Sequence, residues 1–412
     1  MRILILGINY APELAGIGKY TGEMGEWLSA KGVDVKVITA HPYYPEWRVG
    51  DGYRASRYMR EKRNGVEVWR CPIWIPSHKS GIRRILHLLS FALSSLPVLF
   101  KHIFWKPDIL MVVEPTFFCV PFALVAAKLC GAKSWLHIQD FEVDACFKMG
   151  FVSFGPLFQV AKKIERAIMK RFDRVSTLSA KMLKKVFEEG DPSEKLIRFP
   201  NWVDLENICP LSECEFFRKE WGVDEDTLVV LYSGNMGEKQ GLEIIIEVAR
   251  HLSDDADILF VICGAGAVRD RLIHAARGMK NIRFIPLQPL DRLNRLLNTA
   301  DIHLLPQRDD AADIVMPSKL TGILACGGIV IATSRMGTEL ADVVQEAGGI
   351  ICEPGDSVRV ADAIKEIASD RLLQSEIRIK ARNYSEMHLS RDLILGNFYG
   401  ELECLAGISE YG

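Results

Sequence analysis

The stretch YSGNMGEKQGL at residues 232–242 decides the fold class of this chain. It ends the apolar run at 227–233 and leads into apolar residues at helical spacing from Leu242 to Leu252. Glycines at a strand-to-helix turn let backbone N–H groups approach an anion, and the dipole of the following helix favours negative charge there. The stretch therefore predicts a diphosphate-binding turn. Its candidate binding residues are Asn235, Gly237, Lys239, Gln240 and Gly241.

Short apolar runs alternate with helical patterns on both sides of this stretch. Buried apolar strands that alternate with helices indicate parallel sheets covered on both faces. In the first half we expect strands at 2–7, 34–39, 108–113, 134–138, 174–178 and 196–199. In the second half we expect strands at 227–233, 257–263, 282–285, 301–305, 329–333 and 349–352. Two sets of this size predict an α/β chain with two doubly wound, Rossmann-like domains rather than one large sheet.

The domain boundary is expected near Pro200, where a proline and a polar stretch follow a strand. This gives an N-terminal domain at 1–200 and a C-terminal domain at 201–385. The last helical pattern lies within 386–412, and we expect it to pack back on the N-terminal domain.

Charge is distributed unevenly along the 412 residues, although the net charge is only −2. Residues 1–200 hold 30 Lys and Arg against 19 Asp and Glu, whereas residues 201–412 hold 21 against 34. A basic half beside an acidic half indicates either different partners or two complementary surfaces.

The cysteines and the hydropathy pattern indicate in which cellular compartment the protein is expected. Ten cysteines are scattered without a C-x-x-C pair or a zinc-like cluster, which predicts reduced thiols in a cytoplasmic protein. From the sequence we expect neither a signal peptide at the N-terminus nor an apolar stretch of about 20 residues that spans a membrane. We also expect no nucleic-acid partner.

A dinucleotide site is excluded by the glycine pattern. That fingerprint needs G-x-G-x-x-G directly after the first strand and a carboxylate that ends the second. Here Gly16 and Gly18 come well after the strand, and the second expected strand runs into Ala40 and His41. Gly264 also follows a strand without the third glycine. We keep Gly264 as a candidate for close approach of a substrate.

Two more turns suit an anion. One opens the first helix and contributes Gly16, Ile17, Gly18 and Lys19. The other precedes a later helix and contributes Asp313, Pro317, Ser318, Lys319 and Leu320. Free N–H groups, a hydroxyl and a lysine at a helix start favour a phosphate, although an ordinary capped helix gives the same pattern.

His137 and Asp140 are the candidate catalytic residues. They follow a predicted strand at its carboxyl end, where open α/β sheets place their ligands. A histidine there can hydrogen-bond a sugar hydroxyl or a developing charge, and Asp140 or Glu142 could orient it. A structural histidine is the alternative.

The segment at 79–106 combines basic residues with an apolar helical pattern. It is too short to span a bilayer, but such a helix can lie in the membrane interface. Residues 151–171 repeat the pattern, and both segments lie in the basic half. A core helix of the first domain is the alternative interpretation.

Several motifs, taken in order, resemble the WcaI-like group of glycosyltransferase family 4. They are GINYAPEL at 7–14, GIGKYTGEM at 16–24, PYYP at 42–45, HIQD at 137–140, SGN at 233–235, QGL at 240–242 and PSKL at 317–320. The resemblance covers nearly the whole chain.

This resemblance implies a GT-B fold, in which two Rossmann-like domains face a cleft. It also implies a GDP- or UDP-linked sugar donor, retention at the anomeric carbon and no metal or other cofactor. The acceptor would be a polyprenyl-diphosphate-linked sugar at the inner face of the cytoplasmic membrane. His137 would lie near the transferred sugar, and domain closure would bring it to the donor.

Two departures from the family pattern concern the donor site. Many members carry an Arg and a Lys where this chain has Asn235 and Gln240. Many also carry two glutamates at positions that match Ile314 and Gly322, and Asp313 is the nearest carboxylate to the first. A GT-B epimerase or phosphorylase and a non-catalytic scaffold of a polysaccharide assembly complex therefore stay open as alternatives.

Overall fold

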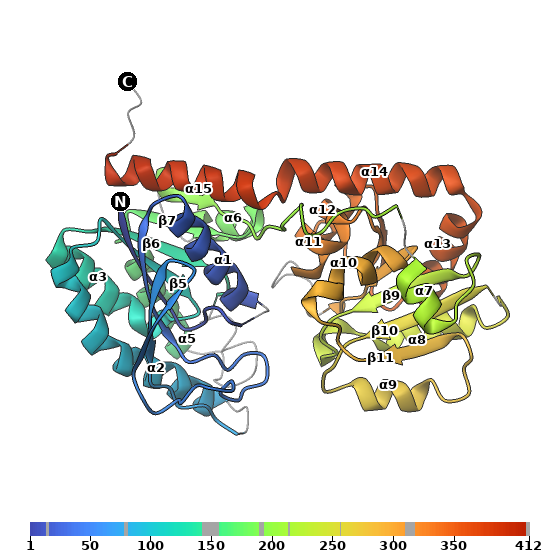
Figure 1. Cartoon of the computed structure of the whole chain (residues 1–412), viewed down its shortest axis with the longest axis horizontal. Coiled ribbons are helices and arrows are strands. Elements are labelled where there is room, and N and C mark those ends of the chain that lie inside the picture. The colour runs from blue at the N-terminus through green and yellow to red at the C-terminus, as the bar shows by residue number, and fades with distance from the viewer. Residues whose placement is uncertain are drawn as a thin grey trace. The chain divides into compact units, whose positions relative to one another are not determined.

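The computed structural model describes residues 1–13, 16–77, 81–141, 156–188, 193–212, 215–255, 257–309 and 318–408. The chain divides into two compact units (Figure 1). The first unit comprises Met1–Pro200 and Ile394–Gly412, and the second comprises Asn201–Leu393. The second unit thus continues past residue 385, which was the expected end of the C-terminal domain, to Leu393.

The first unit is built on a mixed sheet with the strand order β3-β4-β2-β1-β5-β6-β7-β8 in the described residues. Every pairing in it is parallel except that of β3 with β4. The strands are β1 (Arg2–Gly7), β2 (Asp34–Ala40), β3 (Met59–Arg63), β4 (Val66–Cys71), β5 (Ile109–Glu114), β6 (Lys133–Ile138), β7 (Arg174–Thr177) and β8 (Leu196–Arg198).

The hairpin of β3 and β4 is absent from the strands that we expect from the sequence. Its turn is Asn64-Gly65, and both residues have positive φ, at 45° and 87°. An Asn-Gly pair with positive φ at both positions is a strong signal for a two-residue hairpin. The apolar pattern does not show it because β3 is the edge sequence MREKR, whose side chains are half-buried or exposed.

Helices cover both faces of the first sheet. They are α1 (Gly16–Ala30), α2 (Gly81–His102), α3 (Val120–Cys130), α5 (Pro156–Met169), α6 (Ala180–Glu188) and α15 (Arg391–Ala406). One face packs on α2 and α3 through a core that includes Leu6, Val112, Phe91 and Ala123. On the other face, Phe398 of α15 stacks on Phe199 and meets the edge of Trp135.

The second unit is built on an entirely parallel sheet with the strand order β11-β10-β9-β12-β13-β14. Its strands are β9 (Leu228–Ser233), β10 (Ile258–Cys263), β11 (Ile282–Ile285), β12 (Ile302–Leu305), β13 (Ile329–Thr333) and β14 (Ile350–Cys352). Its helices are α7 (Glu215–Trp221), α8 (Glu243–His251), α9 (Arg269–Ala275), α10 (Leu290–Thr299), α11 (Ser318–Ala325), α12 (Glu339–Glu346), α13 (Ser357–Ser369) and α14 (Arg371–His388).

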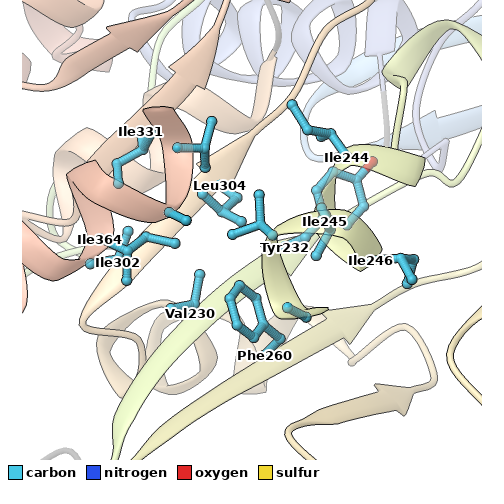
Figure 2. Close-up of a cluster of buried hydrophobic side chains, with 14 of the residues drawn as sticks. Val230, Tyr232, Ile244, Ile245, Ile246, Phe260, Ile302, Leu304, Ile331 and Ile364 are labelled. Carbon is cyan, nitrogen blue, oxygen red and sulfur yellow. The ribbon is translucent and has the colours of Figure 1, made fainter. Parts of the chain in front are cut away.

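Strand β9 is the centre of this unit because both of its faces are buried. Val230 and Tyr232 join a core with Ile245 of α8 and Phe260 of β10 (Figure 2). Val229 and Leu231 point to the opposite face and pack with Phe217 of α7. A strand buried on both faces is typical of a parallel sheet inside a doubly wound fold.

Strand order locates the ligand-binding edge of each sheet. In the second unit, β9 lies between β10 and β12, so the loops that follow β9 and β12 diverge to opposite sides. In the first unit, β1 occupies the same position between β2 and β5. Open α/β sheets bind ligands at such switch points, outside the carboxyl ends of the strands.

Candidate functional site

The loop after β9 is locked against the loop after β10. Gly234 N donates to Cys263 O at 2.9 Å, and Met236 N donates to Ala265 O at 2.8 Å. A Cβ on Gly264, whose φ is 147°, would lie 1.9 Å from Gly234 O. Gly264 is therefore required for the close packing of these two loops, whether or not a substrate also approaches it.

The second part of the loop is a short 3₁₀ turn, Glu238–Gln240, and α8 begins only at Glu243. Gly237 N donates to Gln240 Oε1 at 3.0 Å, and Gly241 reverses the backbone with a φ of 59°. Gln240 thus shapes the loop by capping it. The helical spacing expected from Leu242 corresponds to α8, which follows this turn.

Lys319 lies against the start of the same loop. Its Nζ donates to Tyr232 Oη at 2.6 Å and lies 4.0 Å from the centre of that ring. Tyr232 Oη in turn donates to Asn235 O at 2.5 Å. Burial lowers the pKa of Lys319 to about 7. Its charge therefore responds to pH near neutrality and to any anion that binds beside it.

The remaining candidates of the second unit differ in their exposure. Asn235 and Ser318 are exposed, whereas the side chain of Leu320 is fully buried in the core, which leaves only its backbone for a contact with a substrate. Lys239 has its backbone in the 3₁₀ turn, but its side chain lies outside the described residues. Asp313 and Pro317 lie outside them as well.

Arg308 is a residue at this edge that the sequence does not single out. It follows β12 and packs against Gly241, because a Cβ on Gly241 would lie 2.9 Å from Arg308 Cγ. The signal that could have found it is its position three residues after a buried strand, together with the pairing of β12 with β9.

In the first unit, Glu13 organises the loop that contains Gly16. Its Oε1 accepts from Tyr43 N and Tyr44 N, both at 3.0 Å, and its Oε2 accepts from Asn9 Nδ2 at 2.9 Å. A Cβ on Gly18 would lie 2.4 Å from Glu13 Oε2, so only glycine fits there. Burial raises the pKa of this carboxyl group.

The loops after β1, β2 and β6 converge beside this carboxylate. Gly16 has a φ of 60° and lies against the Tyr44 ring. The pKa of Tyr44 is raised by burial first and then by the charge of Asp140, which places Asp140 near that ring. Ile17 is half-buried, and Lys19 lies 3.8 Å from Glu23 on the next turn of α1.

His137 is fully enclosed on the face of the sheet that packs on α15. Its Nδ1 lies 2.9 Å from Ser176 Oγ, and its ring centre lies 5.0 Å from that of Phe199. At Nδ1 the hydrogen-bond partner of this ring is Ser176 rather than Asp140. Burial lowers the pKa of His137 to about 3, so the imidazole stays neutral in the physiological range.

Two cavities of the second unit, of about 600 and 610 Å³, lie at the opposite edge of the sheet. Thr227 and Ile258 line the first, and Asp301 lines the second, so both lie near the amino ends of strands. Within the described ranges, no group of three or more His, Cys, Asp and Glu residues could hold a metal ion.

Comparison with known proteins identifies the family. Residues 213–384 match the glycosyl transferases group 1 family, and residues 15–202 match the glycosyl transferase 4-like domain. The protein of Escherichia coli strain K12 named as the colanic acid biosynthesis glycosyl transferase WcaI is 43% identical over 98% of this chain and 100% of that protein. This chain is a glycosyltransferase of the WcaI-like group of family 4.

More distant proteins of known structure share its fold. The sucrose-phosphate synthase of Thermosynechococcus elongatus has a TM-score of 0.77 at 15% identity over 99% of this chain and 100% of that one. Anabaena HepE, solved in complex with UDP-glucose, has a TM-score of 0.70 at 14% identity over 98% and 100%. The GT-B fold that the sequence predicts is therefore confirmed.

Proposed function

We propose that this glycosyltransferase moves a sugar from a GDP- or UDP-linked donor to a polyprenyl-diphosphate-linked acceptor. The product would enter an exopolysaccharide, as the name of the relative WcaI indicates for that protein, or an O-antigen. Donor binding is supported by two observations. The turn after β9 is hydrogen-bonded to the loop after β10, and Lys319 contacts Tyr232 at the start of that turn. HepE, which shares the fold, was solved with UDP-glucose.

The chemistry of this turn suits the departure of a nucleoside diphosphate. Glycosyl transfer develops negative charge on the diphosphate, and groups that are fixed in advance near that charge lower the barrier. Gly234, Met236 and Gly237 use their N–H groups within the loops. The Lys319 ammonium and the remaining N–H groups of the turn would supply that stabilisation. A bound diphosphate would also raise the pKa of Lys319 and keep it charged.

The direct test is transfer of radiolabel from GDP- and UDP-sugars to a polyprenyl-diphosphate-sugar in detergent micelles. We expect a lipid-linked product with one of the donors and an unchanged rate in EDTA. Proton NMR of the product would show the same anomeric configuration as the donor. Hydrolysis or epimerisation of the donor without any acceptor would instead support the alternative reactions.

We also propose that the first unit binds the inner face of the cytoplasmic membrane. Ile82, Leu86 and Leu93 form an exposed apolar stripe along α2, and Phe104 continues it. α3 exposes Phe122, Val125 and Leu129. Arg83 and Lys101 flank the α2 stripe, which suits anionic headgroups.

The buried side of α2 favours an interfacial position over a spanning one. The segment Ile82–Trp105 is long and apolar enough to cross a membrane by composition, but 39% of its most apolar window is buried in the unit. Leu88, Phe91 and Ala92 belong to that buried side and join the sheet core.

Flotation with liposomes that contain phosphatidylglycerol tests this surface. Leu86→Glu with Leu93→Glu should release the protein from the vesicles. Leu372→Glu is the control, because it changes a leucine of the second unit that is more exposed, at 78%, than Leu86 at 49% and Leu93 at 64%. Release by both variants to the same extent would contradict the assignment to α2.

A further inference from the structure

Arg308 lies at the switch point of the second sheet. β12 pairs directly with β9, with Ile302 opposite Val230 and His303 opposite Leu231. The loop that follows β12 therefore emerges beside the Gly234–Gly241 turn, on the side away from β10. Ligands of open α/β sheets bind between two loops that diverge in this way.

The stem of Arg308 packs on the turn itself. Gly241 has a φ of 59°, and a Cβ there would lie 2.9 Å from Arg308 Cγ and 3.5 Å from its backbone N. At the other end of the turn, a Cβ on Gly234 would lie 2.9 Å from Lys319 Nζ. One cationic side chain thus lies at each end of the same turn.

The loop that carries Arg308 is held in place by the neighbouring strand. Gln307 N donates to Thr333 Oγ1 at 3.0 Å, and Thr333 Oγ1 donates to Gln307 O at 3.1 Å. Gln307 Oε1 is buried without a hydrogen-bond partner among the described residues. A buried acceptor of this kind is satisfied when a ligand hydroxyl or amide binds beside it.

The charge of Arg308 acts on a residue of the turn. Arg308 is exposed, and its charge reaches Glu238 in the turn. The pKa of Glu238 is lowered mainly by its hydrogen bonds with Arg271, and Arg308 adds to that effect. Arg271 Nη1 donates to Glu238 Oε1 at 3.1 Å, and Arg271 Nη2 donates to Glu238 Oε2 at 2.9 Å.

We propose that Arg308 binds the diphosphate of the donor and supplies the guanidinium that the turn lacks at Asn235. The inference rests on the proposed donor binding of this unit. A guanidinium offers two parallel N–H donors to a phosphate, which a lysine cannot match. The charge comes from the loop after β12 instead of the loop after β9, at the same carboxyl edge of the sheet.

Calorimetric titration of the whole protein with UDP and GDP tests the assignment, with uridine and guanosine measured by displacement. We expect Arg308→Ala to weaken binding of the preferred diphosphate about 10- to 100-fold, the range for a lost charged hydrogen bond. Binding of the corresponding nucleoside should not change. Arg308→Lys should give an intermediate loss.

Two further variants separate a direct contact from a structural effect. Gly241→Ala should displace Arg308 and also strain the turn at its φ of 59°, so the part of its effect on diphosphate binding that is lost in the Arg308→Ala background measures the contribution of Arg308. Arg277→Ala removes an exposed arginine just after α9 and serves as the matched control.

The outcomes distinguish the two levels of the proposal. If the wild-type protein binds neither UDP nor GDP, the proposed donor binding fails and Arg308 loses its role with it. If the wild type binds one of them and Arg308→Ala binds it equally well, the role of Arg308 is overturned while the donor site stands.

Discussion

At the scale of single residues, Lys319 makes donor binding depend on pH. Its pKa is about 7 because it is buried, so it is charged below that pH and neutral above it in the free protein. A cation favours the diphosphate, and affinity should therefore fall as pH rises through about 7 and above. Titration of UDP or GDP from pH 6 to 9 measures this slope.

Lys319→Met should flatten that slope and weaken binding at pH 6 by about 10- to 100-fold, the range for one charged hydrogen bond. Lys365→Met is a suitable control, because Lys365 is an exposed lysine of the same unit that pairs with Asp255. A slope that persists in Lys319→Met would assign the titration to another group.

His137 should matter more for stability than for proton transfer. With a pKa of about 3 it stays neutral, so it adds no inflection near pH 6.5 to the rate profile. Replacing His137 with Ala removes the contacts with Ser176 and Phe199. Truncation at such a buried site should lower the free energy of unfolding by about 2–4 kcal/mol, as urea denaturation can measure.

The sequence predicted Lys319 but not Arg308, for a physical reason. Lys319 stands at the start of a helix, so local pattern alone suggests an anion there. Arg308 gains its position only because β12 lies beside β9, and strand neighbours are a tertiary property. The contact of Ser176 with His137 could not be predicted for the same reason, because it depends on the pairing of β7 with β6.

At the scale of elements, the glycines of the second unit fix how two loops pass each other. Gly264→Ala would place a methyl group against Gly234 O in addition to straining a φ of 147°. We expect the free energy of unfolding to fall by more than about 3 kcal/mol and nucleotide binding to be lost. The methyl group would clash with a backbone atom, which can move only if the two loops separate. Chemical denaturation and calorimetry measure the two effects.

Gly278→Ala provides the contrast for that variant. Gly278 also has a positive φ, of 83°, but nothing lies within 4 Å of the added Cβ. Only the backbone strain of about 1–2 kcal/mol should remain, with binding intact. Equal losses in the two variants would show that strain, and not the packing of the loops, dominates.

Apolar periodicity was sufficient for the buried strands and insufficient at the sheet edge. All twelve strands expected from apolar runs correspond to strands of the structure, with ends that differ by a residue or so. β3 lies at the edge of the sheet, where alternate side chains are exposed and charged. Its sequence therefore contains no apolar run that would predict a strand. Only the Asn64-Gly65 turn carried the information.

At the scale of the whole molecule, the chain returns to its first unit after completing the second. The predicted single helix within 386–412 is interrupted: α14 ends at His388, and α15 begins at Arg391. Val203 and Ser390 form a parallel bridge at this break, and Arg391 pairs with Asp204. The chain passes from one unit to the other near residue 200 and again near residue 393. The segments next to these two points therefore contact each other within the second unit.

This route makes the first unit depend on residues near the C-terminus. Phe398 is 2% exposed and stacks on Phe199 with ring centres 4.1 Å apart. Phe398→Ala should therefore cost about 3–5 kcal/mol of stability, the range for a buried phenylalanine. Hydrogen exchange should rise in β6 and β7, because Trp135 also packs on this ring.

Exchange in β9 and β10 should change less, because the contacts of Phe398 lie in the first unit. Leu393→Ala, on the same helix but 46% exposed, should leave the exchange of β6 close to that of the wild type. Equal increases in β6 and β9 after Phe398→Ala would mean that the two units unfold as one cooperative body. An increase confined to β6 and β7 would mean that the C-terminal helix stabilises the first unit locally.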